Sequence, residues 1–286
     1  MNLLLRADQL RSARTPFVFA TVVRAERPTS AKAGDRALVL PDGTIEGFVG
    51  GTCAETTVRL QGLRLLETGE SLLLRITPED AEPDARPGAE GLLTVANPCL
   101  SGGTMEIFLE AMIPAPLVFV YGEAPVARAL VDVAGSVGWD ARRATELPIP
   151  ADTDAVVVAS HGRDELEVLA AAVKVGVPYI ALVASRKRAA AVLAELDRPE
   201  AEIHAPAGLD IGARTAPEIA LSIVAEVLSL RTARAKPAPS SAKDPVCNMD
   251  VAIVPDALHY VFEGQTYYFC GSGCRAAFAD NPGRYL

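Results

Sequence analysis

Apolar and turn-forming residues alternate in the first part of the chain in a way that predicts both strands and a helix. Residues 17–24 are β-branched and aromatic, and Pro, Asp and Gly at positions 41–43 join two apolar runs as in a hairpin. Residues 54–66 place apolar groups at helical spacing, and Gly69 follows them as a typical C-cap. These patterns predict a mixed α+β domain over residues 1–113.

The second part of the chain changes to a regular alternation of strands and helices. Continuous apolar runs at residues 117–122 and 154–160 are each followed by a segment with helical spacing. Such alternation predicts a parallel sheet covered by helices on both faces, which is a Rossmann-like α/β domain. An amphipathic helix near residues 217–230 is expected to close this domain, residues 117–232.

The last part of the chain is predicted to be a linker and a small module. Residues 233–243 consist of Ala, Arg, Lys, Pro and Ser without a large apolar side chain, which is typical of a flexible tether. Residues 244–286 then show a strand-turn-helix pattern of their own. A unit of about forty residues normally needs a metal ion or a partner surface for stability.

Composition and charge exclude several classes of protein. The 286 residues are half hydrophobic and carry a formal charge of −9, which disfavours nucleic acid as a partner. No apolar run approaches the roughly 20 residues of a membrane span, and the N-terminus lacks the apolar core of a signal peptide. The basic clusters Arg142 with Arg143 and residues 186–188 are either solvated surface or contacts for a small anionic ligand.

Five cysteines in a chain of this length are too few and too unevenly placed for a disulfide framework. We therefore expect reduced thiols and a cytoplasmic location. Cys247, Cys270 and Cys274 fall in the small module and can meet one ion once its hairpin folds back, with His259 as the nearest fourth donor. Thiolate and imidazole ligands favour zinc, copper or iron over magnesium or calcium. The alternative is that these cysteines are small buried apolar residues.

The small module also resembles a known family. Nearly all of residues 244–286 is similar to a YHS domain, and the resemblance implies binding or sensing of a heavy metal whose identity stays open. The segments that carry it are DPVC at 244–247, YYFC at 267–270, Cys274 and NPGRY at 281–285.

Two Gly/Cys loops in the first domain are candidates for a cofactor site. Gly50, Gly51, Cys53 and Glu55 follow a strand and open a helix, an arrangement in which backbone N–H groups and the helix dipole attract an anion and favour a thiolate. A second loop contains Cys99, Gly102 and Gly103. Either loop can equally be an ordinary turn.

Both loops, together with SHGRDE at 160–165, LVASRKR at 182–188 and the segment 205–226, resemble the XdhC/CoxI family over residues 15–231. The similarity is to its CoxI-like branch. The resemblance implies an accessory protein that binds molybdopterin, the molybdenum cofactor, assists its sulfuration with a cysteine desulfurase, and passes it to an apo molybdenum hydroxylase. Xanthine dehydrogenase and aerobic carbon monoxide dehydrogenase are the implied client types. By this resemblance the two loops become the leading cofactor site, with Cys53 or Cys99 as a candidate sulfur carrier or metal-side contact. A homodimer stays open.

Two rival functions depend on other features. The loop after residue 121 keeps only Gly122 of a dinucleotide-binding fingerprint, and Arg142 and Arg143 stand where a ribose-binding acid is expected, so NADP fits better than NAD. An NADPH-dependent oxidoreductase would use His161 as its acid/base, although a lone His is often structural. The other rival is a copper-delivery or metal-sensing protein. We favour a cofactor-binding chaperone over an enzyme.

Overall fold

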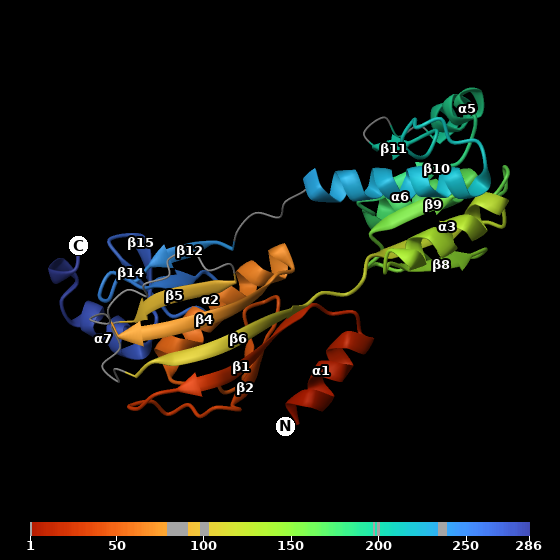
Figure 1. Ribbon diagram of the computed structural model, residues 1–286. Coiled ribbons are helices and arrows are strands. Elements are labelled where there is room, and N and C mark those ends of the chain that lie inside the picture. The colour runs from red at the N-terminus through yellow and green to blue at the C-terminus, as the bar shows by residue number, and fades with distance from the viewer. Residues whose placement is uncertain (1, 79–90, 98–102, 197, 199–200, 234–238) are drawn as a thin grey trace. The chain divides into compact units, whose positions relative to one another are not determined.

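The computed structural model describes residues 2–78, 91–97, 103–196, 198, 201–233 and 239–286 (Figure 1). The chain forms two compact units. Unit 1 combines Met1–Pro114 with Lys236–Leu286, and unit 2 is Ala115–Ala235. No helix among the described residues is both long enough and apolar enough to cross a membrane. The predicted fold class, a mixed α+β domain, a parallel-sheet domain and a small C-terminal module, is confirmed.

Unit 1 is built around a six-stranded sheet in the order β3-β2-β1-β6-β4-β5, in which only β4 and β5 pair in parallel. The strands are β1 (Phe17–Ala25), β2 (Arg36–Val39), β3 (Ile45–Gly47), β4 (Ser71–Pro78), β5 (Leu92–Asn97) and β6 (Met105–Met112). Two helices accompany the sheet, α1 (Leu3–Ser12) and α2 (Thr52–Thr68).

Side chains alternate between the two faces of β1, and each face packs against a different one of these two helices. Phe17 packs with Ala7 and Leu10 of α1, whereas Val18, on the opposite face of the strand, packs with Val58 of α2. Helix α2 ends at the expected position, because Gly69 adopts φ +74° and donates its N–H to the Leu65 carbonyl. The loop that precedes α2 is therefore fixed at one end of a well-anchored helix.

The C-terminal module consists of two hairpins and a helix. The elements are β12 (Ser241–Lys243) with β13 (Asp250–Ala252), β14 (His259–Phe262) with β15 (Gln265–Tyr268), α7 (Ser272–Asp280) and a 3-10 turn, η1 (Pro282–Arg284). Phe278 is fully buried at the centre of an aromatic cluster. Its ring centroid lies within 6.3 Å of the rings of Tyr260, Phe262, Tyr267, Phe269 and Tyr285.

The module rests on helix α2 of unit 1 (Figure 1). Ala252 of β13 and Val254 pack against Leu60 and Leu63 of α2. The stability of the small module therefore comes partly from this surface, and not from a metal ion alone.

The tether differs from the expected residues 233–243 at both ends. Helix α6 (Ala216–Ala233) extends to residue 233, and Ser241–Lys243 pairs with β13. The lack of large apolar side chains predicted a flexible chain here. Residues 241–243 nevertheless form a strand, because a short edge strand needs only backbone hydrogen bonds. The module on the far side of this tether belongs to the same compact unit as the N-terminal domain.

Unit 2 contains a five-stranded parallel sheet in the order β11-β10-β9-β7-β8. Its strands are β7 (Leu117–Tyr121), β8 (Asp140–Ala144), β9 (Ala155–Val158), β10 (Tyr179–Leu182) and β11 (Ile203–His204). With α6, its helices are α3 (Pro125–Ser136), α4 (Glu165–Val175) and α5 (Arg186–Leu196).

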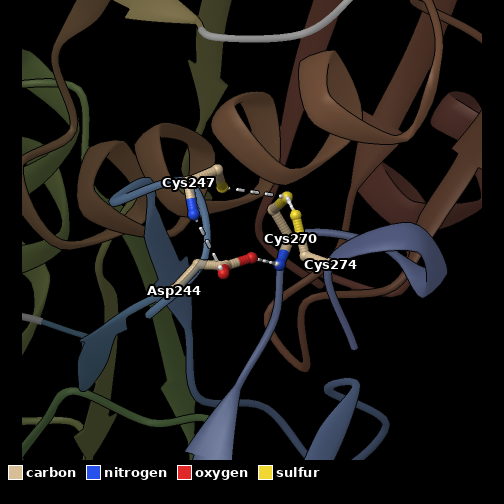
Figure 2. Close-up of side chains that lie close together, drawn as sticks. All are labelled: Asp244, Cys247, Cys270 and Cys274. Carbon is tan, nitrogen blue, oxygen red and sulfur yellow. Dashed lines mark hydrogen bonds between the residues drawn. The ribbon is translucent and has the colours of Figure 1, made fainter. Parts of the chain in front are cut away.

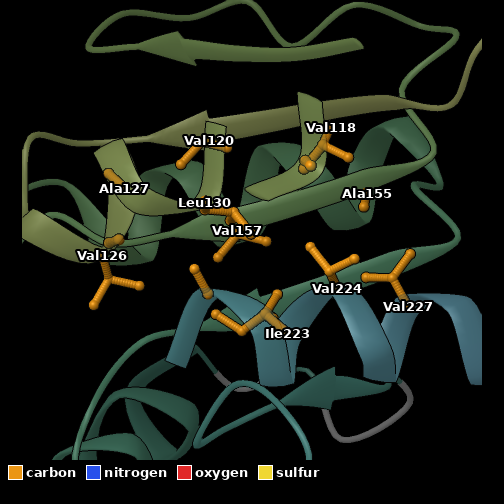
Figure 3. Packing of buried hydrophobic residues seen from close by; sticks show 14 of the residues in the cluster. Val118, Val120, Val126, Ala127, Leu130, Ala155, Val157, Ile223, Val224 and Val227 are labelled. Carbon is orange, nitrogen blue, oxygen red and sulfur yellow. The ribbon is translucent and has the colours of Figure 1, made fainter. Parts of the chain in front are cut away.

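Each face of this sheet is covered by two helices. Val118, Val120 and Val157 point to α3 and α6, where they meet residues such as Leu130 and Ile223 (Figure 3). The intervening strand residues, among them Phe119, Val156 and Ile180, pack against α4 and α5. Because both faces are buried, the strands are continuously apolar, as the sequence pattern indicated.

Candidate functional site

Three thiols of the C-terminal module meet at one point (Figure 2). Cys247 lies in the turn between β12 and β13, Cys270 follows β15, and Cys274 is in the first turn of α7. The sulfur atoms of Cys247 and Cys270 are 3.5 Å apart, and those of Cys270 and Cys274 are 3.6 Å apart. The structure thus brings together the three cysteines that the sequence predicted as metal ligands.

Asp244 holds the two cysteine-bearing loops in place. Its Oδ1 accepts the N–H of Val246 at 2.9 Å and of Cys247 at 3.4 Å, and its Oδ2 accepts the N–H of Cys270 at 2.8 Å. The residue is 1% exposed. Sequence reasoning noted Asp244 only as part of a motif, although an Asp just before a turn is a signal for such side-chain bonds to the backbone. Its carboxylate positions the thiols relative to one another.

The spacing of the thiols fits a soft metal ion. Tetrahedral zinc with Zn–S bonds of about 2.3 Å separates its sulfurs by about 3.8 Å, close to the distances between these sulfur atoms. The ligand atoms of Asp244, Cys247, Cys270 and Cys274 all lie within 4.8 Å of one another. The donor set therefore suits zinc or copper, with thiolates as the ligands.

Hydrogen bonds and burial separate the pKa values of the three thiols. The hydrogen bond with Cys270 lowers the pKa of Cys247. The bond with Cys247, followed by one with Cys53 and by burial, raises the pKa of Cys270. Burial raises the pKa of Cys274 to about 12. A cation bound among these sulfurs would favour their thiolate form.

The expected fourth ligand, His259, is not part of this group of close ligand atoms. Its side chain is exposed, and its Nδ1 lies 2.9 Å from the carbonyl of Ala257. The position at the start of β14 and this local bond direct the ring to the hairpin surface. The fourth residue of the group is Asp244, whose carboxylate is already engaged by three backbone N–H groups.

The first Gly/Cys loop of the N-terminal domain leads into α2. Gly50 has φ +136°, and a Cβ there would lie 3.0 Å from the Cβ of Ala54. Gly51 is the N-cap, with φ −72° and open space around its Cα. Cys53 and Glu55, both half-buried, stand in the first turn of the helix. Glycine is therefore required at position 50 and not at position 51.

Cys53 lies against the C-terminal module. Its side chain packs with Met249, Val251 and Cys270. One turn further along α2, the Thr56 hydroxyl donates to the Cys270 carbonyl at 2.9 Å. Two features that the sequence suggested as separate sites, the loop of Cys53 and the three-thiol cluster, are thus neighbours.

The second Gly/Cys loop falls largely outside the described residues, which include neither Cys99 nor Gly102. Gly103 is described. A Cβ at this position would lie 2.3 Å from the Pro28 carbonyl oxygen and 2.6 Å from that of Glu26. Close packing against residues 26–28 therefore explains this glycine without a ligand.

In unit 2, the strand order reverses between β7 and β9, where ligands often bind in such sheets. Gly122 follows β7 with φ +112°, and a Cβ there would lie 2.4 Å from the Ala159 carbonyl oxygen. Glu123 in this loop pairs at 3.4 Å with Arg163 in the loop after β9. The glycine thus accommodates the chain's own backbone after β9.

A pocket of about 780 Å³ opens at the carboxyl ends of β9, β10 and β11. Three segments far apart in the sequence contribute to its lining: the loop after β9, the start of α5 and the loop after β11. Its polar and charged lining residues are His161, Glu165, Ser185, Arg186, Arg188, Asp210 and Ser222. These are the segments that carried the family resemblance in this half of the chain.

Two carboxylates support the pocket walls. Glu165 is 4% exposed, accepts the N–H of Gly162 at 2.8 Å and pairs with Arg188 at 2.7 Å. Glu226 of α6 accepts the N–H of Gly208 at 2.9 Å and the hydroxyl of Tyr179 at 2.5 Å. Burial, and then this bond, raise the pKa of Tyr179. One wall loop is therefore tied to a buried acid, Glu165, and the other to a half-buried acid, Glu226.

His161 is the predicted acid/base of the rival oxidoreductase. It adopts φ +54°, is exposed, and contributes to the pocket wall. His161 belongs to unit 2, whereas the described cysteines belong to unit 1, and it lines the same pocket as Arg186 and Arg188.

Three comparisons with known proteins bear on this architecture. Residues 10–77 match the XdhC and CoxI family, residues 118–227 the XdhC Rossmann domain, and residues 242–286 the YHS domain. PaoD of Escherichia coli strain K12, a molybdenum cofactor insertion chaperone, is 26% identical over 264 residues, covering 75% of this chain and 83% of PaoD.

YqeB, an uncharacterized protein of Escherichia coli strain K12, is also 26% identical, over 81% of this chain. The chain spans about half of YqeB, 46% of its length. The crystal structure of a xanthine dehydrogenase from Bacillus halodurans aligns with 84% of this chain and 98% of its own, at 18% identity and a TM-score of 0.40. The chain thus carries an XdhC and CoxI family domain, an XdhC Rossmann domain and a C-terminal YHS domain, as its motifs predicted.

Proposed function

We propose that this protein is a maturation chaperone of a molybdenum enzyme and that unit 2 holds the molybdopterin cofactor during its delivery. One observation supports the proposal most. Three segments that are distant in the sequence and that carry the family resemblance line one pocket of about 780 Å³. The function of PaoD as a molybdenum cofactor insertion chaperone supports it. The pocket replaces the Gly/Cys loops of unit 1 as our leading cofactor site.

The pocket has the chemistry that a phosphate-bearing pterin requires. Arg186 begins α5, so its guanidinium and the N-terminal N–H groups of that helix can act on the same anion. Its side chain is 85% exposed and 3.4 Å from Asp210, a loose pairing that an anion can replace. Arg188 is already paired with buried Glu165 and suits a positioning role.

The cysteines of unit 1 supply the thiol chemistry in this proposal. Cys53 and Cys99 remain candidates for carrying sulfur received from a cysteine desulfurase, and an apo molybdenum hydroxylase of the xanthine or carbon monoxide dehydrogenase type is the client. Cys53, Cys247, Cys270 and Cys274 are not in disulfide bonds, which suits a reducing cytoplasmic setting.

Binding of molybdopterin to the full chain tests the cofactor pocket. Arg186→Ala should weaken binding about tenfold, since one charge-assisted contact contributes about 1.5 kcal/mol. Fluorescence of the pterin under anaerobic conditions measures the affinity.

The matched control is Arg142→Ala. Arg142 belongs to the same unit and pairs with Asp140 at 2.6 Å, but it does not line the pocket. Equal affinities of the wild type and Arg186→Ala would reject the pocket as the cofactor site. Loss of affinity in both variants would indicate a general charge effect.

A further inference from the structure

The three thiols of the YHS domain leave one position of a tetrahedral soft-metal site to be filled. Asp244 is the nearest other donor. A carboxylate has roughly four acceptor positions, and backbone N–H groups of the two cysteine loops engage three of those of Asp244. Asp244 is therefore suited to holding the ligands and less suited to being one.

Cys53, which lies outside the YHS domain, also packs against this cluster. It packs against Cys270, the thiol that also contacts both Cys247 and Cys274. Two further residues of α2, one before and one after Cys53, contact the same loop of the YHS domain. Thr56 donates to the Cys270 carbonyl at 2.9 Å, and a Cβ on Gly271 would lie 3.3 Å from Cγ2 of Thr52.

Two helix N-termini also converge on the cluster. Cys53 is the second residue of α2, and Cys274 is the third residue of α7. The first turns of two helices therefore fix the positions of these two thiols.

We propose that Cys53 joins Cys247, Cys270 and Cys274 in one four-thiolate site, which binds a soft divalent ion of the zinc class across the contact between helix α2 and the YHS domain. Cys53 lies outside the group of ligand atoms within 4.8 Å, so its side chain turns about one single bond to reach the ion. The bound ion links two segments that are more than 190 residues apart in the chain.

The site does not depend on the proposed cofactor pocket, which lies in unit 2. It has one consequence that rests on the proposed function: a metal-bound Cys53 is withdrawn from sulfur transfer. Metal occupancy and a sulfur-carrying role of this thiol are then mutually exclusive.

Cobalt(II) as a spectroscopic substitute for zinc tests the four-thiolate site in the full-length, reduced chain. One equivalent should give a tetrahedral thiolate spectrum in the wild type. Cys53→Ser should lose about a quarter of the sulfur-to-cobalt charge-transfer absorption, one ligand in four, and should bind zinc about tenfold more weakly or worse.

Thr56→Val is the control variant. It removes a docking hydrogen bond beside the cluster but leaves all four thiols, so its cobalt spectrum should match that of the wild type. A wild-type spectrum and zinc affinity in Cys53→Ser would overturn the proposal. So would equal losses in the Cys53 and Thr56 variants, which would indicate a docking effect only.

Thiol labelling of the wild type provides a test that needs no variant. Peptide mapping after alkylation should show that zinc slows the labelling of Cys53 about tenfold or more, together with Cys247, Cys270 and Cys274. An unchanged labelling rate of Cys53, with the other three protected, would also refute the four-thiolate site. Neither result affects the pterin binding that tests the pocket of unit 2.

Discussion

The thiol cluster of unit 1 and the pocket of unit 2 are both organised by carboxylates, but these acids have different partners. Asp244 accepts three backbone N–H groups and thereby fixes two loops against each other. Glu165 divides its bonds between the Gly162 N–H and the Arg188 guanidinium, and Glu226 between the Gly208 N–H and Tyr179. The carboxylate of the thiol cluster accepts hydrogen bonds from backbone N–H groups alone. The carboxylates of the pocket also bond charged or aromatic side chains.

This difference matches the size of what each site can hold. The ligand atoms around Asp244 lie within 4.8 Å of one another, which leaves room for a single ion. The pocket of about 780 Å³ has an exposed Arg186 at its wall and is large enough for an organic anion. Our two proposals therefore assign a soft cation and an anionic cofactor to different units of the chain.

The largest effect is expected from Asp244→Ala. The change leaves three buried or half-buried N–H groups without their acceptor, at a cost of about 3 to 5 kcal/mol in the free energy of unfolding. Asp250→Ala, which removes an exposed pair with Lys243 at 3.1 Å, should cost less than about 1 kcal/mol. Urea denaturation of the full chain measures both. Similar costs would show that Asp244 does not organise the cluster.

A somewhat smaller effect is expected in unit 2 from Gly122→Ala. The added Cβ would lie 2.4 Å from the Ala159 carbonyl oxygen at φ +112°, so we expect a loss of about 3 kcal/mol. Gly135→Ala in α3 meets no atom within 4 Å and should instead stabilise by about 0.5 to 1 kcal/mol. Thermal unfolding distinguishes the two. A tolerated Gly122→Ala would remove the packing explanation of this glycine.

Local patterns were sufficient to predict much of the fold. The C-cap at Gly69, the continuous apolar strands of unit 2 and the meeting of Cys247, Cys270 and Cys274 all depend on residues close in sequence or on a regular period. Helix α1 was not predicted, because only Ala7 and Leu10 in it are buried and its apolar pattern is weak.

Long-range contacts account for what the sequence could not show. Thr56 and Cys270 are 214 positions apart, and no property of either residue type indicates that they bond. The bond of Asp244 with the Cys270 N–H, 26 positions away, is also not indicated by the sequence, because every residue but proline carries a backbone N–H. His259 was chosen for its ligand chemistry, but the backbone of its hairpin decides where it points.

Glu226→Gln tests the role of a carboxylate in the pocket wall. The amide keeps the shape but loses the charge that accepts bonds from Gly208, Tyr179 and His204, so we expect a loss of about 2 kcal/mol. Glu218→Gln on the same helix is the control. Glu218 accepts two N–H groups at 2.8 and 2.9 Å but is exposed, and its loss should be about 0.5 kcal/mol. Equal urea midpoints for the two variants would contradict a special role of Glu226.

The smallest effect, and the most specific to unit 1, is expected from Thr56→Val. Valine keeps the shape of threonine and removes only the hydroxyl that donates to Cys270, a buried bond that contributes about 1 kcal/mol. Thr57→Val is its matched control, because Thr57 is equally buried, at 4% exposed, and donates within α2 to the Cys53 carbonyl. Hydrogen exchange of the amides at residues 269–274 should quicken about fivefold in Thr56→Val, since 1 kcal/mol of docking energy is lost there. In Thr57→Val the same amides should exchange at the wild-type rate, because that bond does not reach the YHS domain. If both variants quicken exchange equally, the YHS domain responds to α2 as a whole and the Thr56 contact has no special role in docking.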